Sequence, residues 1–209
     1  MLTTECARKV LEEIIAIFPD VKPELNFSNH FELLVAVMLS AQTTDVAVNK
    51  VTPGLFERFP NPQALTSASP EEIMPYLKTI GLYRNKAKYL YNCAQQLVER
   101  HGGKVPNTRK ELEALAGVGR KTTNVVLSVG FGIPAFAVDT HIHRICLHHN
   151  IVDPGASVRQ VEERVMEVLP PELWTQAHQS LIIFGRRVCH PRNPKCSDYP
   201  QLYLCTDEI

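Results

Sequence analysis

Apolar residues recur along most of the chain at the three- and four-residue spacing of an α-helix. The spacing is clearest near the N-terminus, where six apolar residues share one helical face: Ala7, Val10, Leu11, Ile14, Ile15 and Phe18. A second segment, FELLVAVMLSAQ, is almost wholly apolar. Its length and the cap-like pair Asn29 and Glu32 before it favour a buried helix over a strand. The pattern predicts helices packed around an apolar core.

Capping signatures predict where several other helices begin. Each consists of a serine or threonine followed three residues later by a glutamate or glutamine: Ser69 with Glu72, Thr108 with Glu111, and Ser157 with Gln160. The first pair opens SPEEIMPYLKTIG, a helix that Gly81 can close. The sequence lacks the strict alternation and Asn-Gly turns of β-hairpins. We therefore expect an all-α fold with short loops.

The composition is that of a globular protein but identifies no class of partner. With 209 residues the chain suits one large domain or two small ones, and 44% apolar residues are enough to form a core. Lys plus Arg and Asp plus Glu both total 22, so an anionic ligand must be attracted by a local patch. One such patch lies near the C-terminus: Arg186, Arg187, His190, Arg192 and Lys195.

The apolar segments are too short for a membrane span, and the N-terminus lacks the layout of a signal peptide. We therefore expect a cytoplasmic protein that contacts no membrane. In that compartment cysteines are expected as thiols or metal ligands rather than disulfides. Cys6, Cys93 and Cys146 fall within helical patterns, and we expect them to pack as small apolar residues.

Two glycines interrupt the helical pattern in LEALAGVGRKT. Gly117 and Gly119 bracket Val118 and allow a tight reversal before a new helix that begins near Arg120. Such a turn directs backbone N–H groups outward at a helix N-terminus, where the helix dipole also attracts an anion. The segment therefore predicts a helix–hairpin–helix whose natural ligand is a nucleic-acid phosphate.

Four segments together resemble the endonuclease III family of the helix–hairpin–helix, Gly/Pro-rich-loop, aspartate DNA glycosylases. They are LAGVGRKTTNVV, FGIPAFAVDTHIHR, FELLVAVMLSAQTTDVAVNK and TIGLYRNKAKYL, so the resemblance extends from about Asn26 to Arg187. It implies two all-α domains that hold DNA in the cleft between them. A helical barrel domain with the hairpin would cover residues 21–133, and residues 1–20 plus 134–209 would form the second domain.

The resemblance implies a bifunctional DNA glycosylase and abasic-site lyase of base excision repair. Such an enzyme removes oxidised pyrimidines from duplex DNA and cleaves the abasic site by β-elimination. By match to the family motif, Lys121 is the nucleophile that forms a Schiff base, and Asp139 is the carboxylate that stabilises positive charge on the sugar. Lys121 lies in the first turn of a helix after Arg120, and both features favour a neutral amine. Asp139 stands where an N-cap stands.

The same match suggests further DNA contacts. Gln42 and Leu82 correspond to residues that enter the base stack when a base is flipped out, although a loop residue and a core leucine are the simpler readings. Asp45 corresponds to a residue near the lesion pocket, but capping of the next helix would explain it equally well. His141 is expected at the DNA backbone. The implied partner is double-stranded DNA with damaged bases or abasic sites, bound by a monomer close to the nucleoid.

Many relatives hold a [4Fe–4S] cluster with four cysteines near the C-terminus. Cys189, Cys196 and Cys205 stand at three of these positions, and Tyr199 takes the fourth. Because four thiolates normally bind such a cluster, either a labile three-cysteine cluster survives or the loop folds without iron. We expect loss of the cluster, with four residues packing in its place: Tyr199, Pro200, Leu202 and Tyr203. The lyase chemistry itself requires no cofactor.

The histidine-rich run DTHIHRICLHHN invites a second metal hypothesis, with Asp139, His141, His143, His148 and His149 as ligands. His141 and His143 are two residues apart and therefore face nearly opposite sides of a helix. We do not expect a metal site formed by this run.

Two other functions remain open at this point. A sibling glycosylase could act on another lesion, such as adenine opposite 8-oxoguanine, but those relatives usually lack a lysine at the position of Lys121 and carry a further domain. A non-catalytic module could bind DNA through the hairpin alone. The presence of both Lys121 and Asp139 argues against this second alternative.

Overall fold

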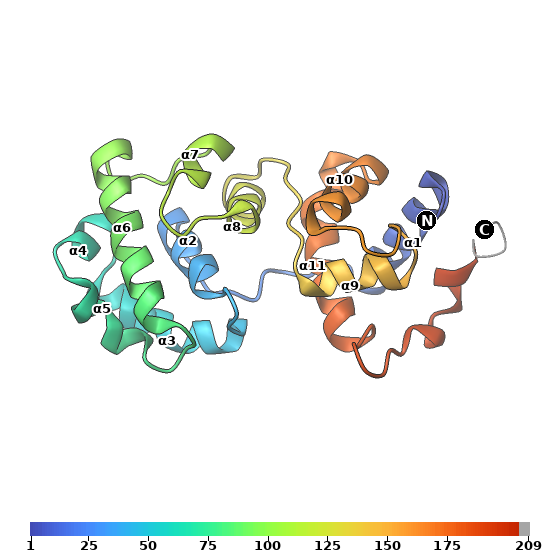
Figure 1. Ribbon diagram of the computed structural model, residues 1–209, viewed down its shortest axis with the longest axis horizontal. Coiled ribbons are helices and arrows are strands. Elements are labelled where there is room, and N and C mark those ends of the chain that lie inside the picture. Colours follow the sequence, from blue (N-terminus) through green and yellow to red (C-terminus); the bar gives the residue numbers. More distant parts are fainter. Residues whose placement is uncertain (205–209) are drawn as a thin grey trace. The chain divides into compact units, whose positions relative to one another are not determined.

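The structure, a computed structural model, describes residues 1–204. In this part of the chain every regular element is helical, which confirms the all-α prediction (Figure 1). Within residues 1–204, eleven α-helices are joined by loops and by short 3₁₀ and π segments. The chain divides into two compact units, Pro23–Ile133 and Met1–Lys22 with Pro134–Ile209.

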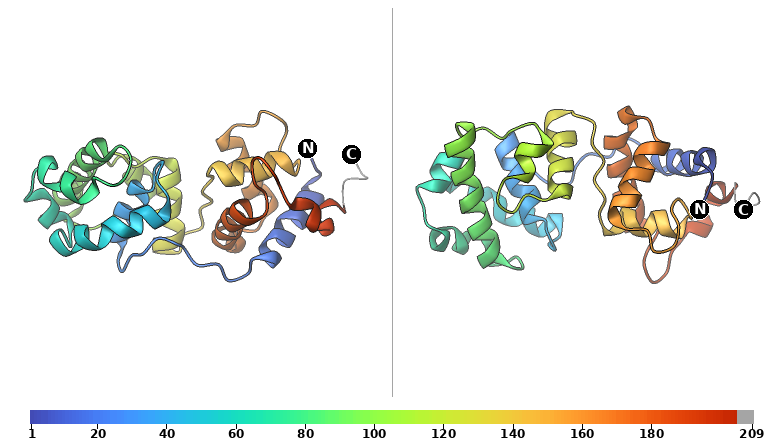
Figure 2. Two further views of the ribbon diagram at one scale, coloured as in Figure 1. Left: turned by 90° about the horizontal axis from the view of Figure 1, so that it is seen from below. Right: turned by 45° about the horizontal axis from the view of Figure 1, so that its top comes forward.

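The unit Pro23–Ile133 is built around α2 and α6. Its elements are α2 (His30–Leu39), α3 (Asp45–Arg58), α4 (Pro62–Thr66), α5 (Pro70–Leu77), α6 (Tyr83–His101), α7 (Arg109–Glu113), α8 (Arg120–Val125) and the π segment η1 (Val126–Gly130). Helix α6 packs against α4, α5 and α2, and α2 also contacts α3, α8 and η1 (Figure 2). Helix α2 is apolar around most of its circumference, which allows it to pack against neighbours on several sides.

The other unit joins the N-terminal helix to the C-terminal third of the chain. Its elements are α1 (Thr4–Ile17), α9 (Thr140–His148), α10 (Val158–Val168), η2 (Pro171–Leu173), α11 (Trp174–Arg187), η3 (Cys196–Asp198) and η4 (Pro200–Tyr203). Helix α11 packs against both α1 and α9. One apolar core results, to which α1 contributes the face that the sequence predicts.

The predicted helix caps are present. Four side chains accept a hydrogen bond from a backbone N–H of the first helical turn: Asn29, Ser69, Thr108 and Ser157. At Ser69 and Ser157 the reciprocal bond is also made, so these two are complete capping boxes. Helix α5 ends at Leu77, earlier than the sequence suggests, and Gly81 does not close it.

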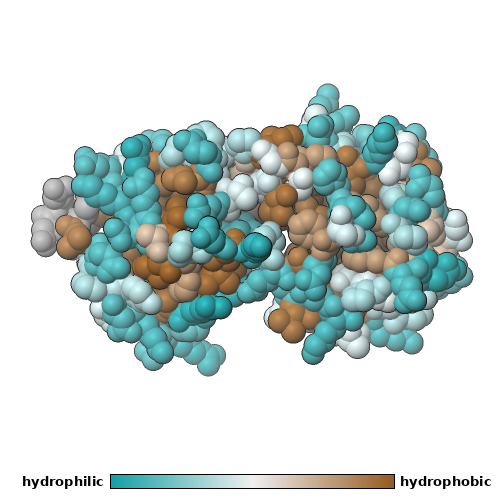
Figure 3. All heavy atoms as spheres, turned by 180° about the vertical axis from the view of Figure 1, so that it is seen from behind, coloured by the Kyte–Doolittle hydropathy of each residue, from teal (hydrophilic) through white to brown (hydrophobic). Residues whose placement is uncertain are grey.

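The surface and the buried cysteines also match what the sequence predicts. Cys6, Cys93 and Cys146 are buried, as expected of small apolar residues. Within residues 1–204 none of the helices combines the length and the apolar character that a membrane crossing needs. Figure 3 shows polar residues over most of the visible face, with smaller apolar areas among them.

Helices α9 and α11 approach each other closely at Gly185. A Cβ atom at this position would lie 2.7 Å from the Cβ of His141 and 3.2 Å from Cδ1 of Ile145. The carbonyl oxygen of Gly185 accepts a hydrogen bond of 2.8 Å from Nη2 of Arg144 on α9. Only glycine fits this crossing, which fixes α9, and with it Asp139 at its N-terminus, against the core of its unit.

We predict that Gly185→Ala lowers the free energy of unfolding by about 1–3 kcal/mol, because the added methyl group forces the two helices apart. Denaturant unfolding followed by circular dichroism measures this change. Gly54→Ala in α3 is the control: the nearest atom to an added Cβ there is 3.9 Å away, and alanine is the better helix former. Equal stabilities of the Gly185→Ala variant and the unaltered protein would contradict the account of this crossing.

Candidate functional site

The glycine turn between α7 and α8 has the geometry that the sequence predicts. Gly117 has a φ of +75°, which favours glycine. A Cβ atom there would lie 2.9 Å from the Cβ of Tyr89 and 3.1 Å from Cε of Met38. Val118 is buried, and its N–H donates to the carbonyl of Leu115 at 3.1 Å. The turn is therefore anchored on α6 and α2.

Helix α8 begins directly after this turn. Gly119 is its N-cap and has no side chain to bond the first amides, and the first bond of the helix runs from Thr123 N to Gly119 O at 2.9 Å. The amides before Thr123 have no acceptor within the helix, which is the arrangement that binds an anion. Arg120 and Lys121 are the first two residues of α8, and both are exposed.

Asp139 is the N-cap of α9, as predicted. Its Oδ1 accepts hydrogen bonds from the backbone N–H groups of His141 and Ile142, both at 2.9 Å. The residue is half-buried and follows the buried segment Ala135–Val138. The two bonds fix the orientation of the carboxylate. The second carboxylate oxygen, Oδ2, takes part in neither of these two hydrogen bonds.

His141 is the second residue of α9 and is half-buried against α11. Its Nδ1 is 3.2 Å from Nη2 of Arg144. Burial lowers the pKa of His141, and the charges of Arg144 and Arg186 lower it further, whereas Asp139 acts in the opposite direction. His141 is therefore suited to a hydrogen bond with DNA as a neutral imidazole rather than to an ion pair.

Gln42 and Leu82 share an uncommon backbone conformation. Their φ angles are +53° and +58°, in the left-handed region that residues with a Cβ rarely adopt. Leu82 is 56% exposed, which excludes the simpler reading as a core leucine. Strained backbone of this kind is concentrated at functional sites, where the surrounding structure maintains it.

A buried lysine that the sequence analysis missed holds the turn that carries Gln42. Lys86 Nζ donates to the carbonyl of Leu39 at 2.8 Å and to Oγ1 of Thr43 at 2.6 Å. Burial lowers the pKa of Lys86. Its place on the face of α6 that also buries Leu90, four residues later, is the signal that could have identified it.

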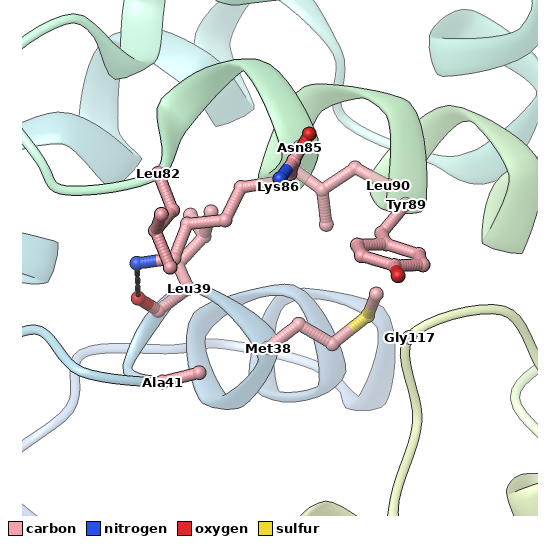
Figure 4. Close-up of a pocket in the computed structure, with 9 residues that line it drawn as sticks. All are labelled: Met38, Leu39, Ala41, Leu82, Asn85, Lys86, Tyr89, Leu90 and Gly117. Atoms are coloured by element: carbon pink, nitrogen blue, oxygen red, sulfur yellow. Dashed lines mark hydrogen bonds between the residues drawn. The ribbon is translucent and has the colours of Figure 1, made fainter.

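Lys86 also lines a pocket of about 340 Å³ between the start of α6, the end of α2 and the glycine turn (Figure 4). Leu82 lies at one end of this pocket, and Tyr89 and Gly117 lie at the other. The pocket thus joins one residue expected in the base stack to the turn expected at the phosphates.

Asp45 is not the cap of α3. The cap is Thr44, whose side chain accepts from the N–H of Ala47 at 3.3 Å, and Asp45 is the first residue of the helix. The interpretation of Asp45 as a cap is therefore wrong. The predicted site residues are divided between the two units. The unit Pro23–Ile133 contains Gln42, Asp45, Leu82 and the segment 117–121, and the other unit contains Asp139, His141, Cys189 and Cys196.

The expectation that the C-terminal loop has lost its cluster is wrong, because the fold gathers a group of metal-ligand side chains there. Two cysteines of the loop, Cys189 and Cys196, lie beside the end of α9, and their sulfur atoms and one ring nitrogen each of His148 and His149 are within 4.8 Å of one another. The sequence analysis considered the cysteines of the loop and the histidines of α9 separately. Nothing in the local sequence shows that the fold brings these cysteines and histidines together. Cys205, the third cysteine of the spacing, lies outside the described residues.

Three of the four residues named as replacement packing, Tyr199, Leu202 and Tyr203, pack on the core beside this group rather than in its place, whereas Pro200 is exposed. Leu202 is buried, and the ring of Tyr199 is 6.2 Å from that of Phe184. The ring of Tyr203 lies 5.7 Å from that of His149, a member of the group.

The chemistry of this group fits a thiolate-bound metal centre of the kind that the family resemblance implies. Cys189 and Cys196 are each 1% exposed and provide soft sulfur donors. Burial, with the neighbouring Cys189, raises the pKa of the Cys196 thiol to about 12, so a metal would have to displace its proton. Burial lowers the pKa of His149 to about 4, which keeps the imidazole neutral, as a metal ligand must be. When bound, a metal here would supply a structural link between α9 and the loop.

The class of protein follows from comparison with known proteins. The chain matches the HhH-GPD superfamily of base excision DNA repair proteins over residues 35–171. It is 45% identical to endonuclease III of Bacillus subtilis (strain 168) over 207 residues, which is 99% of this chain and 94% of that protein. It is 49% identical to endonuclease III of Escherichia coli (strain K12) over 178 residues, 85% of this chain and 84% of the relative.

Solved structures agree with this assignment. A trapped covalent intermediate of endonuclease III with DNA has a TM-score of 0.94 and 45% identity, and the match covers 98% of this chain and 96% of that one. A non-covalent endonuclease III–DNA complex gives a TM-score of 0.94 at 44% identity. The chain therefore belongs to the endonuclease III family. It is a bifunctional DNA glycosylase and abasic-site lyase for oxidised pyrimidines, as the sequence predicts.

Proposed function

We propose that Lys121 and Asp139 carry the two chemical steps of this enzyme. The observation that supports the proposal most directly is that each residue lies at the first turn of a helix, α8 or α9. A helix N-terminus stabilises an anion and disfavours a cation. At α9 the backbone N–H groups hold the carboxylate of Asp139, and at α8 they remain for a DNA phosphate next to Lys121, the second residue of the helix.

In the first step the bond between the damaged base and C1′ of the sugar breaks, and its electron pair leaves with the base. Positive charge develops on the sugar, and the carboxylate of Asp139 stabilises it. The amine of Lys121 then attacks C1′, forms the new C–N bond and loses a proton. The C1′–O4′ bond of the sugar ring then breaks, O4′ keeps its electron pair and takes up the proton that the amine has lost, and a protonated Schiff base remains between Lys121 and C1′.

In the second step the Schiff base draws electrons away from C2′, so a proton leaves this carbon readily. The electron pair left behind forms a C2′–C3′ double bond and expels the 3′ phosphate, which cleaves the strand. Water then hydrolyses the Schiff base and restores the amine of Lys121. A trapped covalent intermediate with DNA among the similar structures supports a covalent route of this kind.

The DNA contacts of this chain are part of the same proposal. The backbone N–H groups of Gly117, Gly119 and Arg120 bind phosphates, Val118 anchors the turn through its own N–H bond to Leu115, and His141 donates to the DNA backbone. Leu82 and Gln42 occupy the gap that a flipped base leaves, since both are exposed and held in strained turns. Asp45 faces the lesion. The two compact units act as the two domains of a monomer on duplex DNA at the nucleoid, with damaged bases or abasic sites as substrate.

We predict that Lys121→Ala abolishes the covalent adduct that borohydride traps on a duplex with thymine glycol, because the amine that forms the Schiff base is removed. Denaturing gel electrophoresis measures the adduct. Lys110→Ala, which removes an exposed lysine of α7 in the same unit, is the matched control and retains full trapping. Unchanged trapping with Lys121→Ala would exclude this residue as the nucleophile.

Asp139→Asn separates charge from capping, since asparagine caps a helix as well as aspartate does. We expect this variant to keep its stability and to excise thymine glycol on the order of 10²-fold more slowly. Strand cleavage at a preformed abasic site, where no base is left to remove, should fall much less. Single-turnover assays on the two substrates measure both rates. Equal losses on both substrates would argue against a role of Asp139 in base removal.

Leu82→Gly should move stability and activity in opposite directions. Glycine adopts a φ of +58° without strain, so we expect the free energy of unfolding to be equal or to rise by up to about 1 kcal/mol. Excision from duplex DNA should fall, because the side chain that fills the stack is gone. Thermal unfolding and excision kinetics test the pair of effects. Full excision activity in this variant would rule out the wedge.

A further inference from the structure

His149 is a buried polar residue that the mechanism above does not use. Its side chain lies at the end of α9 and is 5% exposed. Neither ring nitrogen has a hydrogen-bond partner among the described residues. A neutral imidazole has one donor and one acceptor, and native proteins rarely bury both without a partner. This unpaired state indicates that His149 binds something that residues 1–204 alone do not provide.

The atoms next to His149 are metal ligands. One nitrogen each of His148 and His149 and the sulfur atoms of Cys189 and Cys196 all lie within 4.8 Å of one another. Around a single tetrahedral zinc ion, bond lengths of about 2.0–2.3 Å place the ligand atoms about 3.3–3.8 Å apart. Small side-chain rotations would therefore close the group around a metal.

The backbone already fixes the loop that carries the two sulfur atoms. The N–H of Cys189 donates to the carbonyl of Phe184 at 2.9 Å, and the N–H of Lys195 closes the loop on the carbonyl of Val188 at 2.9 Å. Arg144 of α9 donates twice to the carbonyl of Cys189, from Nε at 3.0 Å and from Nη2 at 2.7 Å. The loop is thus held to the same helix that ends at His149.

We propose that His149 is a metal ligand, which joins Cys189 and Cys196 in a mixed thiolate–imidazole site. It supplies the donor that is missing where Tyr199 stands at a cysteine position of the family spacing. His148, which is exposed, completes the group from the solvent side. Two metal centres share this chemistry, a tetrahedral zinc ion and an iron–sulfur cluster with a histidine ligand.

The test is the metal content of the full-length protein, purified without oxygen, with zinc, iron and acid-labile sulfide measured per chain. Apoprotein titrated with Co²⁺, whose thiolate complexes absorb visible light, gives the affinity. We expect His149→Phe to bind Co²⁺ more than about tenfold more weakly and to lose the native metal. His190→Ala, which removes an exposed histidine next to Cys189, is the matched control and keeps both.

A second variant distinguishes the loss of a metal ligand from misfolding of the protein. His149→Cys restores a donor atom, so it should bind metal with an altered absorption spectrum, which a histidine with a packing role alone would not produce. Cys205→Ser distinguishes the two metal centres: zinc retained in this variant identifies a single ion, and iron and sulfide lost from it identify a cluster. The proposal is overturned if the unaltered protein binds none of these metals, or if His149→Phe binds them as tightly.

Discussion

The electrostatic asymmetry of helix N-termini is the constraint on which the proposed chemistry depends. The backbone amides at such a position attract negative charge and repel positive charge. Helix α9 uses them to hold one oxygen of Asp139 at 2.9 Å from two N–H groups. Helix α8 has a glycine cap instead, so its first amides remain for a phosphate, and Lys121 extends from the same turn. One physical feature thus serves both the proposed phosphate binding and the orientation of the proposed catalytic carboxylate.

Packing within each unit gives these helix ends their positions. Gly117 allows the hairpin to approach α6 and α2 closely, and Gly185 does the same for α9 and α11. Lys86 ties α6 to the turn of Gln42. Arg144 ties α9 to the loop of Cys189, so the helix that begins with Asp139 ends in the buried histidine–cysteine group. The proposed metal site would therefore brace the helix that carries the carboxylate at its other end.

Local features could be predicted from the sequence, whereas features that depend on distant segments could not. The helices, their caps at Ser69 and Ser157, the hairpin and the N-cap at Asp139 are encoded within a few neighbouring residues. The family resemblance then added the activity, which the comparisons confirm. The prediction of a loop without metal was wrong because His149 and Cys189 are 40 residues apart and meet only in the fold. Lys86 was missed because hydrophobic periodicity gives a buried lysine little weight.

The central claim is that the amine at the start of α8 forms the covalent bond to DNA. The most direct measurement is peptide mapping by mass spectrometry of the borohydride-reduced adduct after digestion of protein and DNA. The account predicts that the sugar-derived mass is attached to Lys121 alone. Attachment to another lysine, or to the amino group of Met1, would contradict it.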